Sequence, residues 1–184
     1  MKSEREKMLA GELYVAADPE LSAIRMRARE LFSRYNALPY GDEAGKRALL
    51  DDLLGAAGSN LDIQSPFYCD YGQHIYLGNN CFMNFNCIIL DCAEVRMGDW
   101  VMLGPNVQIY TAYHPLDAAE RCKGPELASP ITIGSRVWIG GGAILCPGIT
   151  IGNDTTIGAG SVVTKDIPAG VFAAGNPCRV IRSL

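Results

Sequence analysis

The chain has 184 residues, a formal net charge of −4 and seven scattered cysteines. Its length suits one domain, or one domain with an appendage, and its acidic balance argues against a nucleic-acid or anionic-membrane partner. The charged N-terminus is unlike a signal peptide, and no apolar run is long enough to cross a bilayer. Because the cysteines lack CxxC pairing, we expect a cytoplasmic protein with reduced thiols.

Residues 1–59 are predicted to form a small α-helical segment. Ser3 and Glu6 have the spacing of a capping box that starts a short first helix. A third helix is expected from residue 42 to residue 54. These helices are too few to build a large core alone, so we expect them to cover the open first end of the segment that follows.

The second predicted helix of this segment is amphipathic. Asp18, which is followed by a proline, has the features of its N-cap. Apolar residues at helical spacing, from Ile24 to Tyr35, form one face. The opposite face carries Arg25, Arg29 and Arg34.

Residues 60–184 carry a six-residue repeat, clearest between residues 133 and 168. The fifth place of each block is small or β-branched, and glycine often follows the first place. A fixed period of six is typical of a parallel β-helix, in which each block is one short strand and a turn, whereas no helical period fits. The sequence therefore predicts an all-β solenoid. Its first-place residues are Ile133, Ile139, Leu145, Ile151, Ile157 and Val163.

The same repeat is present upstream with one shift of register. It runs over residues 71–89, skips two residues and continues over 97–109, which places Tyr113 at an inward fifth position. The repeat stops at His114 and is absent from residues 115–130. A solenoid accommodates such an insertion as a loop, and insertions often mark the binding face. We therefore expect an inserted loop that leaves the wall at His114.

His114 is the candidate catalytic base. It lies at the mouth of the insertion and outside the inward places, and an imidazole with a pKa of about 6.5 can accept a proton near neutral pH. The alternative is a surface histidine that caps a loop. The other histidine, His74, precedes the inward Ile75 and is expected to be structural. Since the chain has only two histidines, it cannot supply three imidazoles to a zinc ion as γ-class carbonic anhydrases do, and no metal is expected.

Five motifs point to a known family. TAYHP, CPGITIG, VVTKDIP and GNPCRVIR, with GELYVAADPEL near the N-terminus, resemble the maltose and galactoside O-acetyltransferases over essentially the whole chain, maltose acetyltransferase most closely. The resemblance implies a left-handed parallel β-helix with three blocks per coil. It also implies a homotrimer with active sites between subunits, and acetyl transfer from acetyl-CoA to a sugar hydroxyl in a ternary complex. In this family the histidine of the TAYHP-like stretch is the general base, which assigns that role to His114.

The resemblance also suggests acceptor contacts. The galactoside enzymes use a serine, an asparagine and an aspartate, whose places are occupied here by Asp70, Asn84 and Cys92. Two of the three differ in type, so a galactoside preference does not follow. Asp91, next to Cys92, could replace the missing aspartate, and Asn84 could equally be a turn residue.

Two further carboxylates are candidates for substrate binding. Asp18 is a possible acceptor contact, although its position as an N-cap already gives it a structural use. Glu126, in the inserted loop, could orient the imidazole of His114, or it could be an ordinary solvated glutamate.

The family's CoA-binding positions lie in the last coils and the tail. Pantetheine can pair with the backbone at small residues such as Gly141, and cations can hold the phosphates. Alternatively, the basic residues only keep the tail soluble. The backbone N–H groups of residues 140–142 are candidate donors to the oxyanion. The implied positions are Trp138, Ala159, Thr164, Lys165, Arg179 and Arg182, the two arginines being expected on a short helix or a coil.

Three functions remain open at this point. The first is an acetyl-CoA-dependent O-acetyltransferase that acts on maltose, glucose or a galactoside. The second is the same transfer to a non-sugar hydroxyl, such as that of serine or an antibiotic. The third is a non-catalytic scaffold, because a β-helix by itself does not determine a function.

Overall fold

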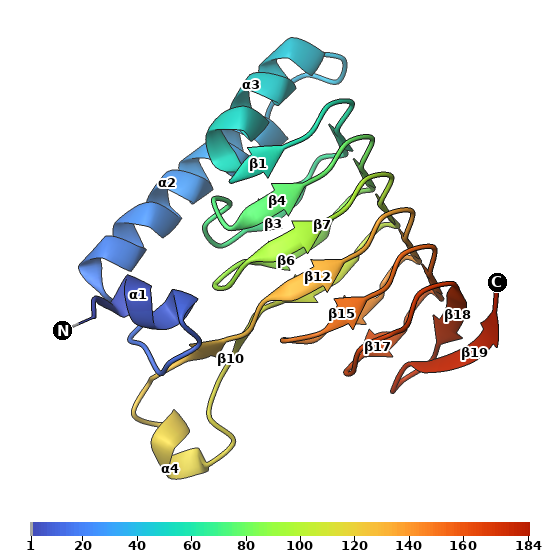
Figure 1. The fold of residues 1–184 in the computed structure, drawn as a ribbon. Helices are drawn as coiled ribbons and strands as arrows, with labels where there is room; N and C mark the ends of the chain where they lie inside the picture. The colour runs from blue at the N-terminus through green and yellow to red at the C-terminus, as the bar shows by residue number, and fades with distance from the viewer. Residues whose placement is uncertain (1) are drawn as a thin grey trace.

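The computed structural model describes residues 2–184 as a parallel β-helix with three helices beside its N-terminal end (Figure 1). The helices α1 (Glu4–Leu9), α2 (Pro19–Asn36) and α3 (Glu43–Leu53) precede the coils, and a short helix, α4 (Ala118–Arg121), lies in the inserted loop. No helix within residues 2–184 is both long and apolar enough to span a bilayer.

Three sheets form the sides of the β-helix, and each complete coil gives one strand to each sheet. Face 1 contains β1 (Ala56–Ala57), β4 (Ile75–Leu77), β7 (Val95–Met97), β12 (Ile131–Ile133) and β15 (Thr150–Ile151). Face 2 contains β2 (Asp62–Ile63), β5 (Phe82–Met83), β8 (Met102–Leu103), β13 (Trp138–Ile139), β16 (Thr156–Ile157), β18 (Val171–Ala174) and β19 (Arg179–Ser183). Face 3 contains β3 (Phe67–Cys69), β6 (Cys87–Leu90), β9 (Gln108–Tyr110), β14 (Ile144–Leu145) and β17 (Val162–Val163).

Within the three faces of residues 2–184, the pairings between coils are parallel, and β19 returns antiparallel on β18 at the C-terminal end. The predicted solenoid with a helical N-terminal segment is therefore confirmed. Its left-handed sense stays a prediction from the family resemblance. β1 already belongs to the first coil, so the predicted boundary at residues 59 and 60 lies between β1 and β2.

Most inward places of the repeat belong to one continuous hydrophobic core. Every first-place residue from Ile133 to Val163 is buried, as are the intervening fifth-place residues. Tyr113 is the exception, because 39% of its surface is exposed. It lies in β10 (Ala112–Tyr113), which leaves the wall and pairs antiparallel with β11 (Leu127–Ala128). The inward position predicted for Tyr113 is wrong for this reason.

The coils differ in length at one edge only. Leu77 pairs with Met97, twenty residues later, whereas Ile133 pairs with Ile151, eighteen residues later. The two extra residues lie between face 3 and face 1, once before β4 and once before β7, and the inserted loop leaves the next coil at the same edge. We call these segments, residues 70–74, 91–94 and 111–130, the irregular edge. In chain order, these three segments are its first, second and third corners. The six-residue repeat in the sequence shifts or stops at the second and third corners, but it gave no sign of the first.

The N-terminal helices begin as predicted. The Ser3 hydroxyl accepts from the Glu6 N–H at 3.1 Å, and the Glu6 carboxylate accepts from the Ser3 N–H at 2.7 Å. Asp18 caps α2, accepting from the Glu20 N–H at 2.9 Å. α2 runs along the side of the first coils, and α1 lies near β10 (Figure 1). The residues between α1 and α2 are thereby brought next to the irregular edge, where Tyr14 exchanges backbone hydrogen bonds with Glu126.

Glycines at the edge between faces 1 and 2 test how closely the coils stack. A Cβ added to Gly134 would lie 2.7 Å from the backbone nitrogen of Asn153 in the next coil, so we expect Gly134→Ala to lower the free energy of unfolding by about 1–3 kcal/mol. Gly170 is the matched control: its φ is +68° and no atom of residues 2–184 lies within 4 Å of an added Cβ. Asparagine tolerates this conformation, as Asn80 does in the same stack, so Gly170→Asn should change stability little. Chemical denaturation of both variants measures the difference, and equal losses would contradict this packing.

Candidate active site

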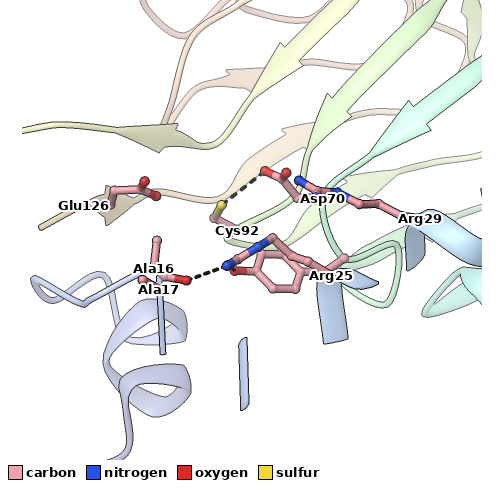
Figure 2. Close-up of a pocket in the computed structure, with 8 residues that line it drawn as sticks. Ala16, Ala17, Arg25, Arg29, Asp70, Cys92 and Glu126 are labelled. Carbon is pink, nitrogen blue, oxygen red and sulfur yellow. Dashed lines mark hydrogen bonds between the residues drawn. The ribbon is translucent and has the colours of Figure 1, made fainter. Parts of the chain in front are cut away.

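The irregular edge brings together side chains from three successive coils. Asp70 comes from the first corner, Cys92 from the second, and His114 and Glu126 from the inserted loop. They line two adjoining cavities that share Asp70 and Glu126. The arginine-side cavity, of about 370 Å³, is lined also by Ala16, Ala17, Arg25, Arg29, Tyr71 and Cys92 (Figure 2). The histidine-side cavity, of about 330 Å³, is lined also by Leu90, Tyr110, Ala112, Tyr113 and His114.

Asp91 holds the first corner in place. It is fully buried, and one carboxylate oxygen accepts from the N–H groups of Asp70 at 3.0 Å and Tyr71 at 2.8 Å. The other oxygen accepts from the His74 N–H at 3.3 Å. Burial raises the pKa of this carboxyl to about 7, although the backbone donors lower it. The predicted sugar contact by Asp91 is therefore wrong: this residue positions Asp70 and does not reach a substrate.

His114 projects from the wall, as predicted, and is exposed. Its Nδ1 lies 3.3 Å from the backbone oxygen of Pro125. Because a carbonyl oxygen only accepts, Nδ1 bears the hydrogen in this contact and Nε2 keeps its lone pair. The group that orients the ring is thus a backbone carbonyl of the inserted loop rather than the Glu126 carboxylate that the sequence suggested.

Glu126 is held by the N-terminal segment. Its carboxylate accepts from the Tyr14 hydroxyl at 2.8 Å, and the two residues also form an antiparallel bridge. Tyr14 is itself buried. The carboxylate is therefore fixed at the boundary between the two cavities, where it can contact a bound molecule.

Asp70 and Cys92 form a pair at the same boundary. The Cys92 thiol donates to the Asp70 carboxylate at a distance of 3.5 Å (Figure 2). Burial raises the pKa of Asp70 above its ordinary value, and it also raises the pKa of the Cys92 thiol. A neutral thiol beside a carboxylate is a weak donor and leaves most of the carboxylate's accepting capacity for a ligand.

Arg25 and Arg29 line the arginine-side cavity, and the sequence did not identify them as site residues. Their spacing of four residues on α2 puts both on one side of that helix. Arg25 is occupied: it donates to the Tyr71 hydroxyl at 2.6 Å and to the Ala16 carbonyl at 2.5 Å. Arg29 points toward Asp70 without a hydrogen bond to any of the other residues drawn in Figure 2. The helical spacing was the only available signal, and it did not reveal which residues α2 packs against.

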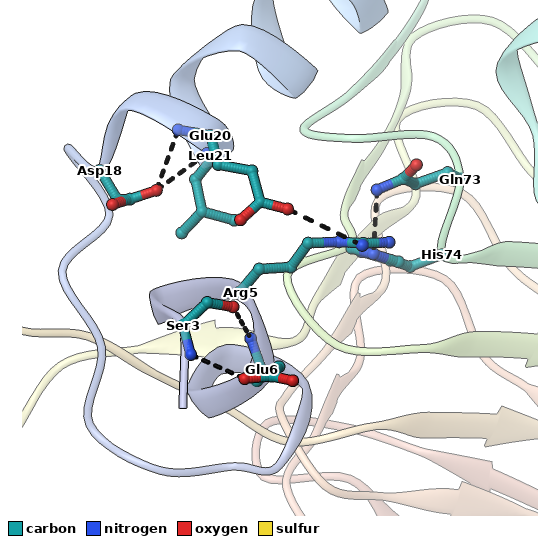
Figure 3. A network of polar contacts seen from close by, with 8 residues as sticks. All are labelled: Ser3, Arg5, Glu6, Asp18, Glu20, Leu21, Gln73 and His74. Carbon is teal, nitrogen blue, oxygen red and sulfur yellow. Dashed lines mark hydrogen bonds and ion pairs between the residues drawn. The ribbon is translucent and has the colours of Figure 1, made fainter. Parts of the chain in front are cut away.

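His74 is structural, as expected. Its Nδ1 donates to the Asp91 carbonyl at 2.7 Å, and its Nε2 lies 3.4 Å from the side-chain nitrogen of Gln73. Burial lowers the pKa of His74, which favours the neutral form of the ring. Figure 3 shows Arg5 extending from α1 to this ring, next to the N-terminus of α2. Asp18 lies at that N-terminus and lines neither cavity, so its role as an N-cap accounts for it.

The remaining acceptor candidate lies at a different edge. Asn84 is in the turn from face 2 to face 3, where its side-chain oxygen accepts from the Phe85 N–H at 2.7 Å. It lines neither cavity of this chain. The structure therefore separates Asn84 from Asp70, Cys92 and His114.

The positions predicted to bind CoA are distributed over two edges. Gly141 and Ala159 stack in turns between faces 2 and 3, whereas Thr164 and Lys165 are exposed after β17. Trp138 is on face 2 with 52% of its surface exposed. Arg179 and Arg182 belong to the exposed strand β19, so the helix or coil expected for them is wrong.

Two of the three candidate oxyanion donors are already used. Gly140 donates to the Ile157 carbonyl and Gly142 to the Pro105 carbonyl, both at 2.8 Å. Within residues 2–184 the N–H of Gly141 makes no backbone hydrogen bond. The same part of the chain contains no group of three or more His, Cys, Asp or Glu side chains arranged to hold a metal ion.

Two family motifs match the chain. Residues 7–58 match the maltose acetyltransferase hexapeptide capping motif, and residues 130–165 match the bacterial transferase hexapeptide motif of six repeats. The first match covers α2, which supplies Arg25 and Arg29 to the arginine-side cavity, and the second covers the most regular coils.

Similar proteins extend over the full chain. Nodulation protein L of Rhizobium meliloti is 53% identical over 180 residues, covering 97% of this chain and 98% of its own. The crystal structure of a maltose O-acetyltransferase from Clostridium difficile superposes with a TM-score of 0.99 and 48% identity, covering 100% and 98% of the two chains. A hexapeptide-repeat acetyltransferase from Vibrio cholerae, crystallised with acetyl coenzyme A, gives a TM-score of 0.93 and 40% identity, covering 100% and 99%.

The buried carboxyl of Asp91 predicts a specific pH dependence of stability. Its pKa rises from an ordinary 3.8 to about 7 on folding, so between these values the folded chain binds a proton that the unfolded chain lacks. Raising the pH through this window therefore costs stability, by about 1 kcal/mol per pH unit. Asp91→Asn removes the titration and retains a side-chain oxygen as acceptor. Unfolding free energies at pH 5, 6 and 7 should show the wild type losing stability relative to the variant. A constant difference would contradict the buried position.

Proposed function

Because the chain belongs to the hexapeptide-repeat acetyltransferases that carry the maltose acetyltransferase capping motif, we propose that it acetylates a hydroxyl group of a sugar. Acetyl-CoA is the acetyl donor, as in the family. The observation that carries the proposal for the acceptor is the position of His114, exposed at a cavity bordered by two carboxylates, Asp70 and Glu126. Carboxylates accept hydrogen bonds from sugar hydroxyls, and the maltose O-acetyltransferase of C. difficile has the same fold.

The proposed reaction begins with proton removal by His114. With Nδ1–H donated to the Pro125 carbonyl, Nε2 accepts the proton of the acceptor hydroxyl as its oxygen attacks the thioester carbonyl. The carbonyl also stabilises the imidazolium that forms, because it accepts from the ring's other N–H. When the tetrahedral intermediate collapses, the C–S bond breaks and the imidazolium returns the proton to the departing CoA sulfur. The products are the acetyl ester and CoA.

The oxyanion of the intermediate needs a hydrogen-bond donor. Of the candidates in the glycine-rich turn, the Gly141 N–H is the one without a backbone partner in the described part of the chain, and a donor at this place would stabilise the negative charge. The Gly140 and Gly142 N–H groups remain committed to the stacking of the coils.

We propose that a second copy of the chain completes the site. His114 projects at one edge of face 3 and Gly141 lies at the other, and the strand between them rises about 3.3 Å per residue. Within one chain, pantetheine paired with Gly141 and Ala159 would therefore lie on the order of 15 Å from His114. If a neighbouring copy places its own Gly141 turn next to His114, the base and the pantetheine wall come together in one site. The Asn84 turn of that copy lies at the same edge and would approach the site with it.

The outward side chains support contacts between copies through two of the three faces. Face 1 presents a polar row, whereas faces 2 and 3 present largely apolar rows. A contact between two different surfaces closes into a ring when repeated by rotation, and the family resemblance makes that ring a homotrimer. The outward residues are Tyr76, Arg96, Thr132 and Thr150 on face 1; Phe82, Met102, Trp138, Thr156 and Phe172 on face 2; and Ile88, Gln108, Ile144 and Val162 on face 3.

In this arrangement the phosphates of CoA are held by the predicted cations. Lys165, Arg179 and Arg182 are exposed and can donate to phosphate oxygens, while Trp138 offers an exposed ring on face 2. The seven cysteines are all free thiols, which favours the reducing cytoplasm as the site of the reaction.

Removal of the base tests the proposed chemistry. The protein mixed with acetyl-CoA and a thiol-reactive dye should release CoA when maltose, glucose or a galactoside is added. His114→Ala should lower this rate by about 10²–10⁴ with an unchanged thermal unfolding midpoint, because the ring is exposed. Release with serine or an antibiotic but with no sugar would move the acceptor to a non-sugar hydroxyl. Absence of any release, and of acetyl-CoA binding by calorimetry, would favour the scaffold.

Subunit mixing tests whether two copies share each site. Ala159→Trp is expected to block the pantetheine wall, and His114→Ala removes the base, so each variant alone should be inactive. Co-expressed in equal amounts, they should regain about a quarter of the wild-type activity, since that fraction of sites combines an intact histidine with an intact wall from the neighbour. No regain in a mixed oligomer would place both residues in one subunit's site.

A further inference from the structure

The arginine-side cavity is larger than the reacting hydroxyl requires. The acceptor oxygen must lie within about 3 Å of Nε2 of His114, which places it in the histidine-side cavity. His114 does not line the arginine-side cavity, which begins beyond Asp70 and Glu126. Each cavity, at about 330 and about 370 Å³, is in the size range of a small-ligand pocket of roughly 300–1,000 Å³. An acceptor that extends past Asp70 would occupy both.

The two arginines of this cavity differ in what they contact. The Arg25 guanidinium is held by the Tyr71 hydroxyl, the Ala16 carbonyl and the Ser22 hydroxyl, the last at 3.2 Å, and it lies 5.5 Å from the centre of the Tyr71 ring. It therefore builds the cavity wall. Arg29, one turn further along α2, is exposed, and Figure 2 shows it beside Asp70 with no hydrogen bond to the residues drawn.

The surroundings of Arg29 define what it can bind. Its guanidinium can donate up to five hydrogen bonds in a planar fork. The other charged groups that line the cavity are Asp70, Glu126 and the occupied Arg25, and the Tyr71 hydroxyl and the Cys92 thiol line it as well. A ligand group here therefore meets a donor in Arg29 and acceptors in the two carboxylates. The hydroxyl and ring oxygens of a sugar combine both functions, whereas a purely apolar group would leave the charges without partners.

We propose that Arg29 is a specificity-determining residue that binds the second ring of a disaccharide or longer acceptor, while the first ring presents its hydroxyl to His114. This inference rests on the proposed sugar acetylation. Arg29 contacts oxygen atoms of the distal ring, and Asp70 and Glu126 contact the acceptor at the junction between the rings. Its contribution is to acceptor binding, because the guanidinium is remote from the reacting atoms.

The test compares matched acceptors of one and two rings. CoA release is measured at saturating acetyl-CoA with glucose and maltose, galactose and lactose, and N-acetylglucosamine and its β-1,4-linked disaccharide. The wild type should have the higher kcat/KM for the disaccharide in at least one pair. In that pair, Arg29→Ala should lower kcat/KM for the disaccharide about tenfold or more, the size of a lost charge-assisted hydrogen bond. The loss should come mainly through KM, with the monosaccharide changed less than twofold.

Two variants of the same helix serve as controls. Arg34→Ala removes an exposed arginine of α2 that lines neither cavity. It should leave kcat/KM unchanged for both the monosaccharide and the disaccharide, which distinguishes the loss of a direct contact from an effect of net charge. Arg29→Lys keeps the charge and loses the planar fork, so it should recover only part of the disaccharide rate.

The outcomes separate this inference from the proposed function. If the wild type releases CoA with sugars but prefers monosaccharides in every pair, the inference is overturned and sugar acetylation stands. The inference is also overturned if Arg29→Ala lowers kcat/KM equally for the monosaccharide and the disaccharide, or if it does not lower kcat/KM for the disaccharide. If no sugar supports CoA release, the proposed function is itself contradicted, and the inference about Arg29 is contradicted with it.

Discussion

The location of the site depends on the strand register of the β-helix. Each strand pairs in parallel with the equivalent strand of the next coil, so a corner that is two residues longer lies directly above or below the other long corners. Between faces 3 and 1 this produces the irregular edge, where the inserted loop also leaves the wall. Asp91 then fixes the first corner, residues 70–74, because its carboxylate accepts hydrogen bonds from three backbone N–H groups. One buried carboxylate thus sets the position of Asp70 relative to His114.

The helical N-terminal segment contributes to this site as well as covering the first coil. Tyr14 fixes Glu126, Ala16 and Ala17 form part of the cavity wall, and α2 supplies Arg25 and Arg29. In the proposed function, the segment that matches the capping motif therefore takes part in acceptor binding. Relatives with a similar β-helix and a different sequence over α2 are expected to differ in the acceptor they bind while sharing the acetyl donor.

The sequence predicted the parts of the molecule that follow local rules. The six-residue period required Ile133 and its equivalents to point inward, and Asp18 with Pro19 required a helix start. Tyr113 was misplaced because its antiparallel partner β11 lies at the far end of the insertion, where no repeat marks it. The buried position of Asp91 and the role proposed for Arg29 could not be read from the chain either. They depend on which corner stacks on which, and on the side of the β-helix along which α2 runs.

In the proposed complex, the irregular edge holds the acceptor with its hydroxyl at Nε2 of His114. The most direct measurement is a crystal structure of the protein with CoA and an acceptor sugar. We expect an acceptor oxygen about 2.6–3.2 Å from Nε2, Nδ1 still directed at the Pro125 carbonyl, and Asp70 in contact with the sugar. A sugar bound away from this edge, or an imidazole turned so that Nδ1 faces the acceptor, would contradict it.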